Sequence, residues 1–178
     1  MKNPNKPNTS RVFVIHGRNE EMRRALFDFL RAIDLKPIEW SEAVTLTGKP
    51  SPFVSEILDA AMHYAQAIIV FFTGDDEVRL KEEFLWVNDP VYEREATPQS
   101  RPNVIFEAGL ALGKYPDRTI LVQVGNLRPF SDIAGRHFVH LKNSSKSRQE
   151  LAQRLKLAGC EVDLTGTDWL EAGSFPTK

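Results

Sequence analysis

Two short runs of apolar, β-forming residues constrain the fold of this chain more than any other feature. They are Val12-Phe13-Val14-Ile15 and the segment from Ala67 to Phe72. A run without alternating polar residues is typical of a strand buried on both faces. Between the runs, apolar residues recur at helical spacing over residues 22–33 and 53–65. Strands that alternate with helices predict a parallel sheet covered by helices on both faces.

Three further strands are predicted, at Pro37–Trp40, Thr119–Val124 and Phe138–Leu141, the first of them more polar and therefore at an edge. Helices are predicted at Val104–Lys114 and over residues 151–158. Five strands linked in this way predict an α/β, flavodoxin-like fold with strand order 2-1-3-4-5. In such folds, ligands bind beyond the carboxyl ends of the strands, at the switch point between the first and third strands.

Four segments fall outside this pattern. Residues 1–10 are polar and are predicted to be disordered, and residues 161–178 are predicted to form a C-terminal tail, loose beyond Gly166. Residues 74–102 are dense in charge and are interpreted as an insert, with a short helix, in a domain spanning residues 11–160. Ser41–Pro52 is predicted to be a loop, too long to be a mere connector.

Composition excludes several classes of partner and location. The net charge of -1 gives no overall attraction to nucleic acid or to an anionic membrane surface. The longest apolar run is too short to span a bilayer, and the N-terminus has no apolar signal-peptide core. A single cysteine, Cys160, excludes an intrachain disulfide and suits a reducing compartment. We therefore expect a cytoplasmic protein without nucleic-acid or membrane partners.

The helix predicted after Arg101 carries one carboxylate, Glu107, among uncharged and mostly small residues. Gly109, Ala111 and Gly113 are expected to let the helix pack closely on the sheet. A carboxylate in the first turns of a helix interacts favourably with the helix dipole. Two interpretations stay open at this point: a solvated side chain, or a group that acts on a ligand.

The predicted switch point gathers further polar residues. His16-Gly17-Arg18 follows the first strand, and Asp75-Asp76 follows the third. His16 is interpreted as a site residue or as a structural histidine. The aspartates suit a metal ion or ribose hydroxyls, but equally a turn that leads into the insert. Arg18 and Arg101 flank this region and are candidates for phosphate contacts, although surface arginines are common.

Several known site types are absent from the sequence. Gly48-Lys49 is followed by Pro50 and lacks the upstream glycine of a P-loop. Neither a G-x-G-x-x-G fingerprint nor a G-x-S-x-G elbow occurs. His137 and His140 are three positions apart in a predicted strand, so they point to opposite faces and make no metal pair.

Three segments, Val12-Phe13-Val14-Ile15-His16-Gly17-Arg18, Thr73-Gly74-Asp75-Asp76 and Arg101-Pro102-Asn103-Val104-Ile105-Phe106-Glu107-Ala108-Gly109, resemble bacterial TIR-like domains of anti-phage effectors. The resemblance is to the Pycsar and TIR-STING type and runs from about Arg11 to His140. Relatives commonly have Leu at the position of Ala108 and a shorter segment before the helix. The resemblance implies a flavodoxin-like domain that cleaves NAD+ between nicotinamide and ribose once a sensor makes it assemble.

The resemblance also assigns roles. It places the catalytic carboxylate on Glu107 and the family's aspartate pair on Asp75 and Asp76. NAD+ is then the substrate, with no cofactor and no metal ion, and self-assembly is expected through the loop at residues 41–52. A cyclic-nucleotide sensor, fused or separate, is the implied partner. The residues expected to bind substrate are His16, Gly17, Arg18, Trp40, Ser41, Asp75, Asp76, Arg101 and Asn103.

The implied chemistry needs little machinery. Nicotinamide leaves NAD+ as a neutral base from a cationic precursor, so one carboxylate that stabilises an oxocarbenium-like transition state is sufficient. Two alternatives remain. A nucleoside deoxyribosyltransferase would use the same Glu107 as a covalent nucleophile, although the chain lacks an early tyrosine or aspartate near the first strand. A non-catalytic TIR interaction module would need no active carboxylate.

Overall fold

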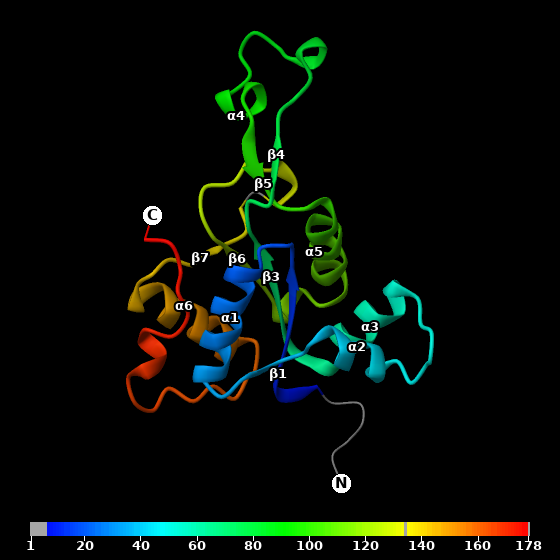
Figure 1. Cartoon of the computed structure of the whole chain (residues 1–178), viewed down its shortest axis with the longest axis vertical. Coiled ribbons are helices and arrows are strands. Elements are labelled where there is room, and N and C mark those ends of the chain that lie inside the picture. The colour runs from blue at the N-terminus through cyan, green and yellow to red at the C-terminus, as the bar shows by residue number, and fades with distance from the viewer. Residues whose placement is uncertain (1–6, 134, 178) are drawn as a thin grey trace.

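The computed structural model describes residues 7–133 and 135–177, and its centre is a five-stranded parallel sheet (Figure 1). The strand order is β2-β1-β3-β6-β7, which is the predicted 2-1-3-4-5 order once the two strands of the insert are set aside. The predicted fold class is therefore confirmed. The strands are β1 (Asn8–His16), β2 (Lys36–Pro37), β3 (Ala65–Phe72), β6 (Thr119–Gln123) and β7 (Val139–His140).

Helices cover both faces of the sheet and create two separate cores. Side chains alternate along each strand, so Val12 and Val14 join the core under α1 and α6, while Phe13 and Ile15 join the other core. This double burial explains why the central runs contain no polar residue. The helices are α1 (Glu20–Ala32) and α6 (Ser145–Leu157) on one face, and α2 (Trp40–Leu46), α3 (Val54–Tyr64) and α5 (Pro102–Lys114) on the other.

The edge strand β2 is shorter than predicted. It pairs with β1 only through Arg11↔Lys36 and Val12↔Pro37, and Ile38 N–H then donates to the carbonyl of Val12 at 2.9 Å. At Trp40 the chain turns into α2, so about half of the predicted 41–52 loop is helical. The helix forms because Ala43 is fully buried in the core beside α3. As a result, the carboxyl half of β1 has no strand partner on this side.

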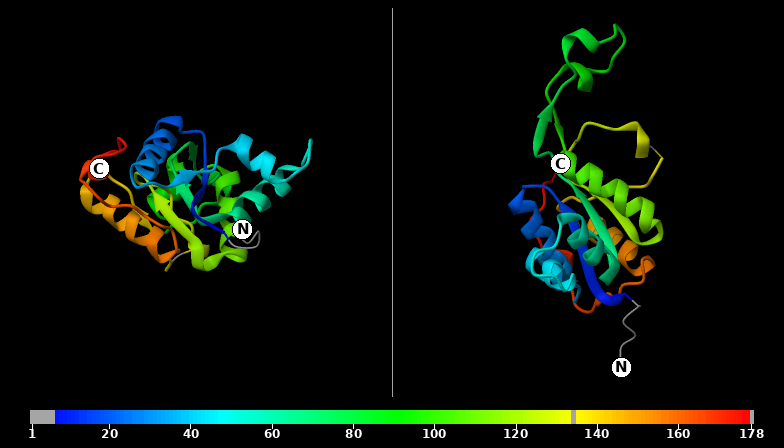
Figure 2. Two further views of the ribbon diagram at one scale, coloured as in Figure 1. Left: turned by 90° about the horizontal axis from the view of Figure 1, so that it is seen from below. Right: turned by 90° about the vertical axis from the view of Figure 1, so that its right-hand side faces the viewer.

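The predicted insert is an arm that stands clear of the body (Figures 1 and 2). Its base is an antiparallel pair, β4 (Asp76–Val78) and β5 (Thr97–Gln99), and its short helix is α4 (Val91–Arg94). The two strands were not predicted because each has three residues and the pair is distant in sequence. The tip leaves Trp86 78% and Val87 90% exposed.

The C-terminal segment is not loose, which corrects our prediction for the residues beyond Gly166. Trp169 and Phe175 are buried in the core that contains α1 and α6. Arg148, only 1% exposed, donates to the carbonyls of Ala172 and Gly173 at 2.8 and 2.6 Å. At the other end, residues 8–10 belong to β1 instead of a disordered segment, and residues 1–6 lie outside the described residues.

The packing of α5 also differs from our expectation. Gly109 and Gly113 are exposed, and a Cβ added at either would meet nothing within 4 Å. The sheet is contacted through the small buried residues Ala108 and Ala111, so Ala111 packs as expected and the two glycines do not. Within the described ranges, no helix is both long enough and apolar enough to cross a membrane.

Candidate functional site

The candidate site is a cleft of about 370 Å³ along the open edge of β1. It exists because β2 ends early and leaves residues 13–16 of β1 without a strand partner on that side. The end of β1 forms its floor, and Trp40, at the start of α2, forms part of its wall. Glu107 enters from α5. The structure thus brings together three predicted site residues, His16, Trp40 and Glu107, from three separate segments.

Glu107 is half-buried in this cleft. Among residues 7–133 and 135–177, no basic side chain lies within ion-pair distance of its carboxylate, and no hydrogen bond to it is formed. Burial alone raises the pKa of the Glu107 carboxyl, because desolvation disfavours the charged form. A carboxylate held in this way interacts strongly with any positive charge that enters the cleft.

A further wall of the cleft is formed by charged residues of α1 and by Glu39, and it was not predicted from the sequence. Glu20, Arg23 and Glu39 line the cleft, with Arg23 pairing to Glu20 at 2.7 Å and to Glu39 at 3.6 Å. The hydrogen bond from Arg23 lowers the pKa of Glu20. These charges are thus paired with each other. In the sequence, Glu20 and Arg23 fall on the polar face of an amphipathic helix, and their spacing alone does not distinguish a solvent face from a cleft wall.

His16 is held against its own loop and the wall of α1. Its Nδ1 lies 2.8 Å from the carbonyl oxygen of Gly17, and its ring meets Phe27 edge-on with centroids 6.4 Å apart. The Arg23 guanidinium lies over the Phe27 ring, 5.0 Å from its centroid. Phe27 therefore supports two cleft residues at once, a role that its position in a hydrophobic pattern does not reveal.

The loops after β1 and β3 are clasped together by Asp75. One carboxylate oxygen accepts a hydrogen bond from the backbone N–H of Arg18, and the other accepts one from the Thr73 hydroxyl at 2.6 Å. Gly17 is required at this point, because an added Cβ would overlap with the Asp75 carboxylate. Asp75 therefore performs the turn role that we had left open, and its predicted contact with substrate stays a prediction.

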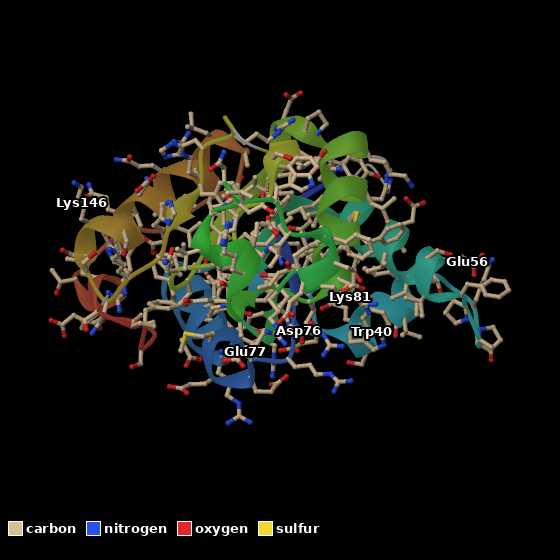
Figure 3. The ribbon with its side chains drawn as sticks, turned by 90° about the horizontal axis from the view of Figure 1, so that it is seen from above. Trp40, Glu56, Asp76, Glu77, Lys81 and Lys146 are labelled. Carbon is tan, nitrogen blue, oxygen red and sulfur yellow. The ribbon has the colours of Figure 1, made fainter. Side chains whose placement is uncertain are left out.

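Asp76 and Arg101 form the second link at this edge of the sheet. Arg101 Nη1 lies 3.1 Å from Asp76 Oδ1, and the aliphatic part of Arg101 approaches Gly17. Figure 3 shows Asp76 and Trp40 on the same side of the molecule when the carboxyl edge is viewed from above. The predicted group of Gly17, Arg18, Asp75, Asp76 and Arg101 is therefore assembled in space, adjacent to the cleft through His16.

Two further predicted residues belong neither to the cleft lining nor to the adjacent group around Asp75 and Arg101. Ser41 is exposed on the first turn of α2, and Asn103 is exposed on the first turn of α5. Their binding roles stay predictions. His137 precedes β7 and its Nε2 lies 2.8 Å from Glu150. In the described part of the chain, no group of three His, Cys, Asp or Glu residues is placed to hold a metal ion.

Comparison with known proteins adds independent evidence. The sequence model of the family described as "CAP12/Pycsar effector protein, TIR domain" matches residues 11–143. The chain is also 24% identical over 161 residues to the uncharacterized protein YuaY of Escherichia coli (strain K12). That alignment covers 89% of this chain and 48% of YuaY. The chain thus spans about half the length of the curated relative it matches.

Proposed function

This chain belongs to the TIR domain family of CAP12/Pycsar effector proteins, effectors of anti-phage defence, and from that premise we propose that it hydrolyses NAD+ to nicotinamide and ADP-ribose. The observation that supports the proposal most directly is Glu107, a half-buried carboxylate without a charged partner among the described residues. Such a group costs folding stability, so its presence in a cleft favours a functional role.

The proposed step breaks the bond between C1 of the ribose and the nicotinamide nitrogen. The bonding electrons leave with nicotinamide, which becomes neutral, while positive charge develops on the ribose as an oxocarbenium ion. The Glu107 carboxylate stabilises that charge, and water then adds to C1 and releases a proton. Because the leaving group needs no protonation, a second catalytic carboxyl is not required.

The cleft fits part of this substrate. Its volume of about 370 Å³ lies near the lower end of small-molecule pockets, which suits the nicotinamide-ribose half of NAD+. Trp40 offers an aromatic surface to the flat ring. The pyrophosphate would then lie toward Arg18 and Arg101, whose guanidinium groups suit phosphate oxygens.

The test compares nicotinamide release by the wild type and by Glu107→Gln at high protein concentration. Gln keeps the shape and removes the charge, so we expect the rate to fall by about 10²–10³, or roughly 3–4 kcal/mol of transition-state stabilisation. Chromatography of the product separates linear from cyclic ADP-ribose. A Glu107→Gln variant that consumes NAD+ at the wild-type rate would exclude the mechanism, and an interaction module would remain. Deoxynucleosides in a parallel reaction test the transferase alternative.

We further propose that assembly through residues 41–52, driven by a cyclic-nucleotide sensor, activates the domain. The segment ends beside Phe53, which is 78% exposed. Substituting Phe53→Ser should weaken self-association in analytical ultracentrifugation and lower activity at high concentration. Val87→Ser on the arm removes an equally exposed apolar residue elsewhere and is the matched control. Equal effects of the two substitutions would show that the segment has no special part in assembly.

A further inference from the structure

A second cavity lies on the other flank of α5 and shares no lining residue with the Glu107 cleft. It has a volume of about 260 Å³ and is located at the carboxyl ends of β3 and β6. Ile105 faces this cavity, while Glu107, two positions later on the same helix, faces the cleft. Two helical positions correspond to about 200° of rotation, so α5 separates the two spaces.

The walls of this cavity combine aromatic rings with carboxamides. Phe72, Phe130 and Phe138 line it, and the ring of Phe72 lies 6.0 Å from that of Phe130 and 5.6 Å from that of Phe138. Gln99 and Gln123 also line it. The Gln123 amide donates to the carbonyl of Gly125 at 3.0 Å, which leaves its own oxygen free to accept. The Gln99 side chain has no hydrogen-bond partner among the described residues.

Hydrogen bonds and an ion pair hold the outer wall of the cavity in place. Arg128 N–H donates to the carbonyl of Pro98 at 2.8 Å, and the Arg128 guanidinium forms an ion pair with Glu93 of the arm. A Cβ added to Gly74 would lie 2.7 Å from Pro98 Cβ and 3.1 Å from Leu127 Cδ2, so three segments pack tightly here. The cavity therefore stays open although the segments around it are closely packed.

From this arrangement we infer that the cavity binds a small, neutral, planar ring that carries an amide or amidine edge, such as nicotinamide or a free nucleobase. The volume is below that of pockets for drug-sized ligands and suits one ring system. The phenylalanine rings contact the faces and edges of the ligand. The adjacent donor and acceptor on its edge pair with Gln99 and Gln123.

Two other ligand classes fit less well. A hydrocarbon would leave the Gln99 amide without a partner inside the cavity, which weakens binding by about a power of ten. A charged ligand would find the Arg128 charge already paired with Glu93, while Arg136 on the wall is exposed to water. The inference does not depend on NAD+ cleavage, because none of these residues contributes to the cleft.

The test is a titration of the whole chain with nicotinamide, adenine and benzene, followed by two-dimensional NMR. Nicotinamide or adenine should saturate with a Kd in roughly the millimolar range, as expected for about ten heavy atoms. The side-chain amide signals of Gln99 and Gln123 should shift. The ring that binds more tightly shows whether the natural ligand is a nicotinamide or a nucleobase. Glu107→Gln should bind it unchanged, which separates this result from that of the proposed activity.

Gln99→Leu should weaken binding of the preferred ring about tenfold or more and should tighten benzene binding, because the amide that benzene leaves unpaired is gone. Gln153→Leu makes the same change on an exposed face of α6 and should have no effect. Ile133→Trp should fill the cavity and abolish binding of all three probes. Shifts confined to His16 and Trp40, no saturable binding, or benzene binding as tightly as either ring would overturn the inference.

Discussion

Glu107 combines two properties that act against each other in folding and together in catalysis. Burial raises its pKa above the ordinary value of 4.5, which means that the folded state resists ionisation of this group. A cationic transition state reverses that penalty, because it supplies the opposite charge that the folded chain does not. Under the proposed function, the cost of ionising Glu107 in the folded protein is recovered when a cationic ligand binds.

The pH dependence of activity should report this residue directly. Catalysis requires the carboxylate, so the rate should rise with pH through the Glu107 pKa and then level off. Because that pKa is raised, the acid limb should lie at higher pH than an ordinary glutamate would give. Values of kcat/KM, taken from initial rates at NAD+ concentrations below KM across acidic buffers, report the pKa of the free enzyme and measure it. An acid limb at or below pH 4.5 would contradict the environment described for Glu107.

The same pKa shift predicts the stability of Glu107→Gln. The folded-state pKa lies above the unfolded one, so the wild type loses stability as pH rises through that interval. Gln does not titrate. The variant should thus melt slightly higher at neutral pH, within about 1 kcal/mol, and the advantage should vanish in acid. Repulsion from Asp75 and Asp76 is not the cause of the shift, because these carboxylates are engaged with the loop and with Arg101.

Gly17→Ala should be destabilising, because the new methyl group overlaps with the Asp75 carboxylate that joins two loops. We expect a cost of about 1–3 kcal/mol in urea unfolding and a loss of activity. Gly109→Ala is the matched control, since nothing lies within 4 Å of its added Cβ. In a helix this change should stabilise by about 0.5–1 kcal/mol. Equal costs for both substitutions would remove the role assigned to Gly17.

A site residue could be predicted from the sequence only where it stands out from the local pattern around it. His16 and Glu107 were identified because one ends a buried strand and the other interrupts an uncharged helix. Glu20 and Arg23 were missed because an amphipathic pattern looks the same whether its polar face meets water or a cleft. Only the tertiary position of α1 beside the open edge of β1 makes the difference.

At the scale of elements, β2 and α2 mark the limit of sequence reasoning. The long strands were predictable because burial on both faces leaves an unmistakable apolar run. β2 has two residues, and its length is set by where α2 begins to pack on α3. That choice is a tertiary one, and it creates the cleft. The C-terminal segment was misjudged for a similar reason, since its buried residues, Trp169 and Phe175, are isolated in a polar sequence.

Arg148 anchors that segment to α6 and provides a direct test of its packing. Arg148→Met keeps much of the volume but removes the donor that the half-buried carbonyls of residues 172 and 173 share. We expect a loss of about 2–4 kcal/mol in urea unfolding. Lys146→Met, on the exposed outer end of the same helix (Figure 3), should change stability by no more than about 0.5 kcal/mol. A loose segment would make the two variants alike.

At the scale of the whole molecule, the arm and the body should behave as separable parts. Val78 and Thr97 face each other in the β4–β5 pair, so residues 79–96 are replaceable by Asn-Gly, a two-residue hairpin turn. The shorter loop favours folding by about 2 kcal/mol, roughly three halvings in length. That gain offsets the lost pair between Arg128 and Glu93. Circular dichroism and urea unfolding should show an intact body, and a molten one would refute the separation.

The way the arm joins the body also shows where the chain can accept new termini or an inserted domain. Both ends of the arm meet at one pair of neighbouring residues, Asp76 and Gln99. The residues between them contribute no strand to the five-stranded sheet. Exposed loop tips of this kind are where circular permutation and domain insertion succeed most often. A permuted chain opened near Val87 would keep all five sheet strands covalently intact. The tip of the arm is thus a site at which a second domain could be inserted without interrupting the five-stranded sheet.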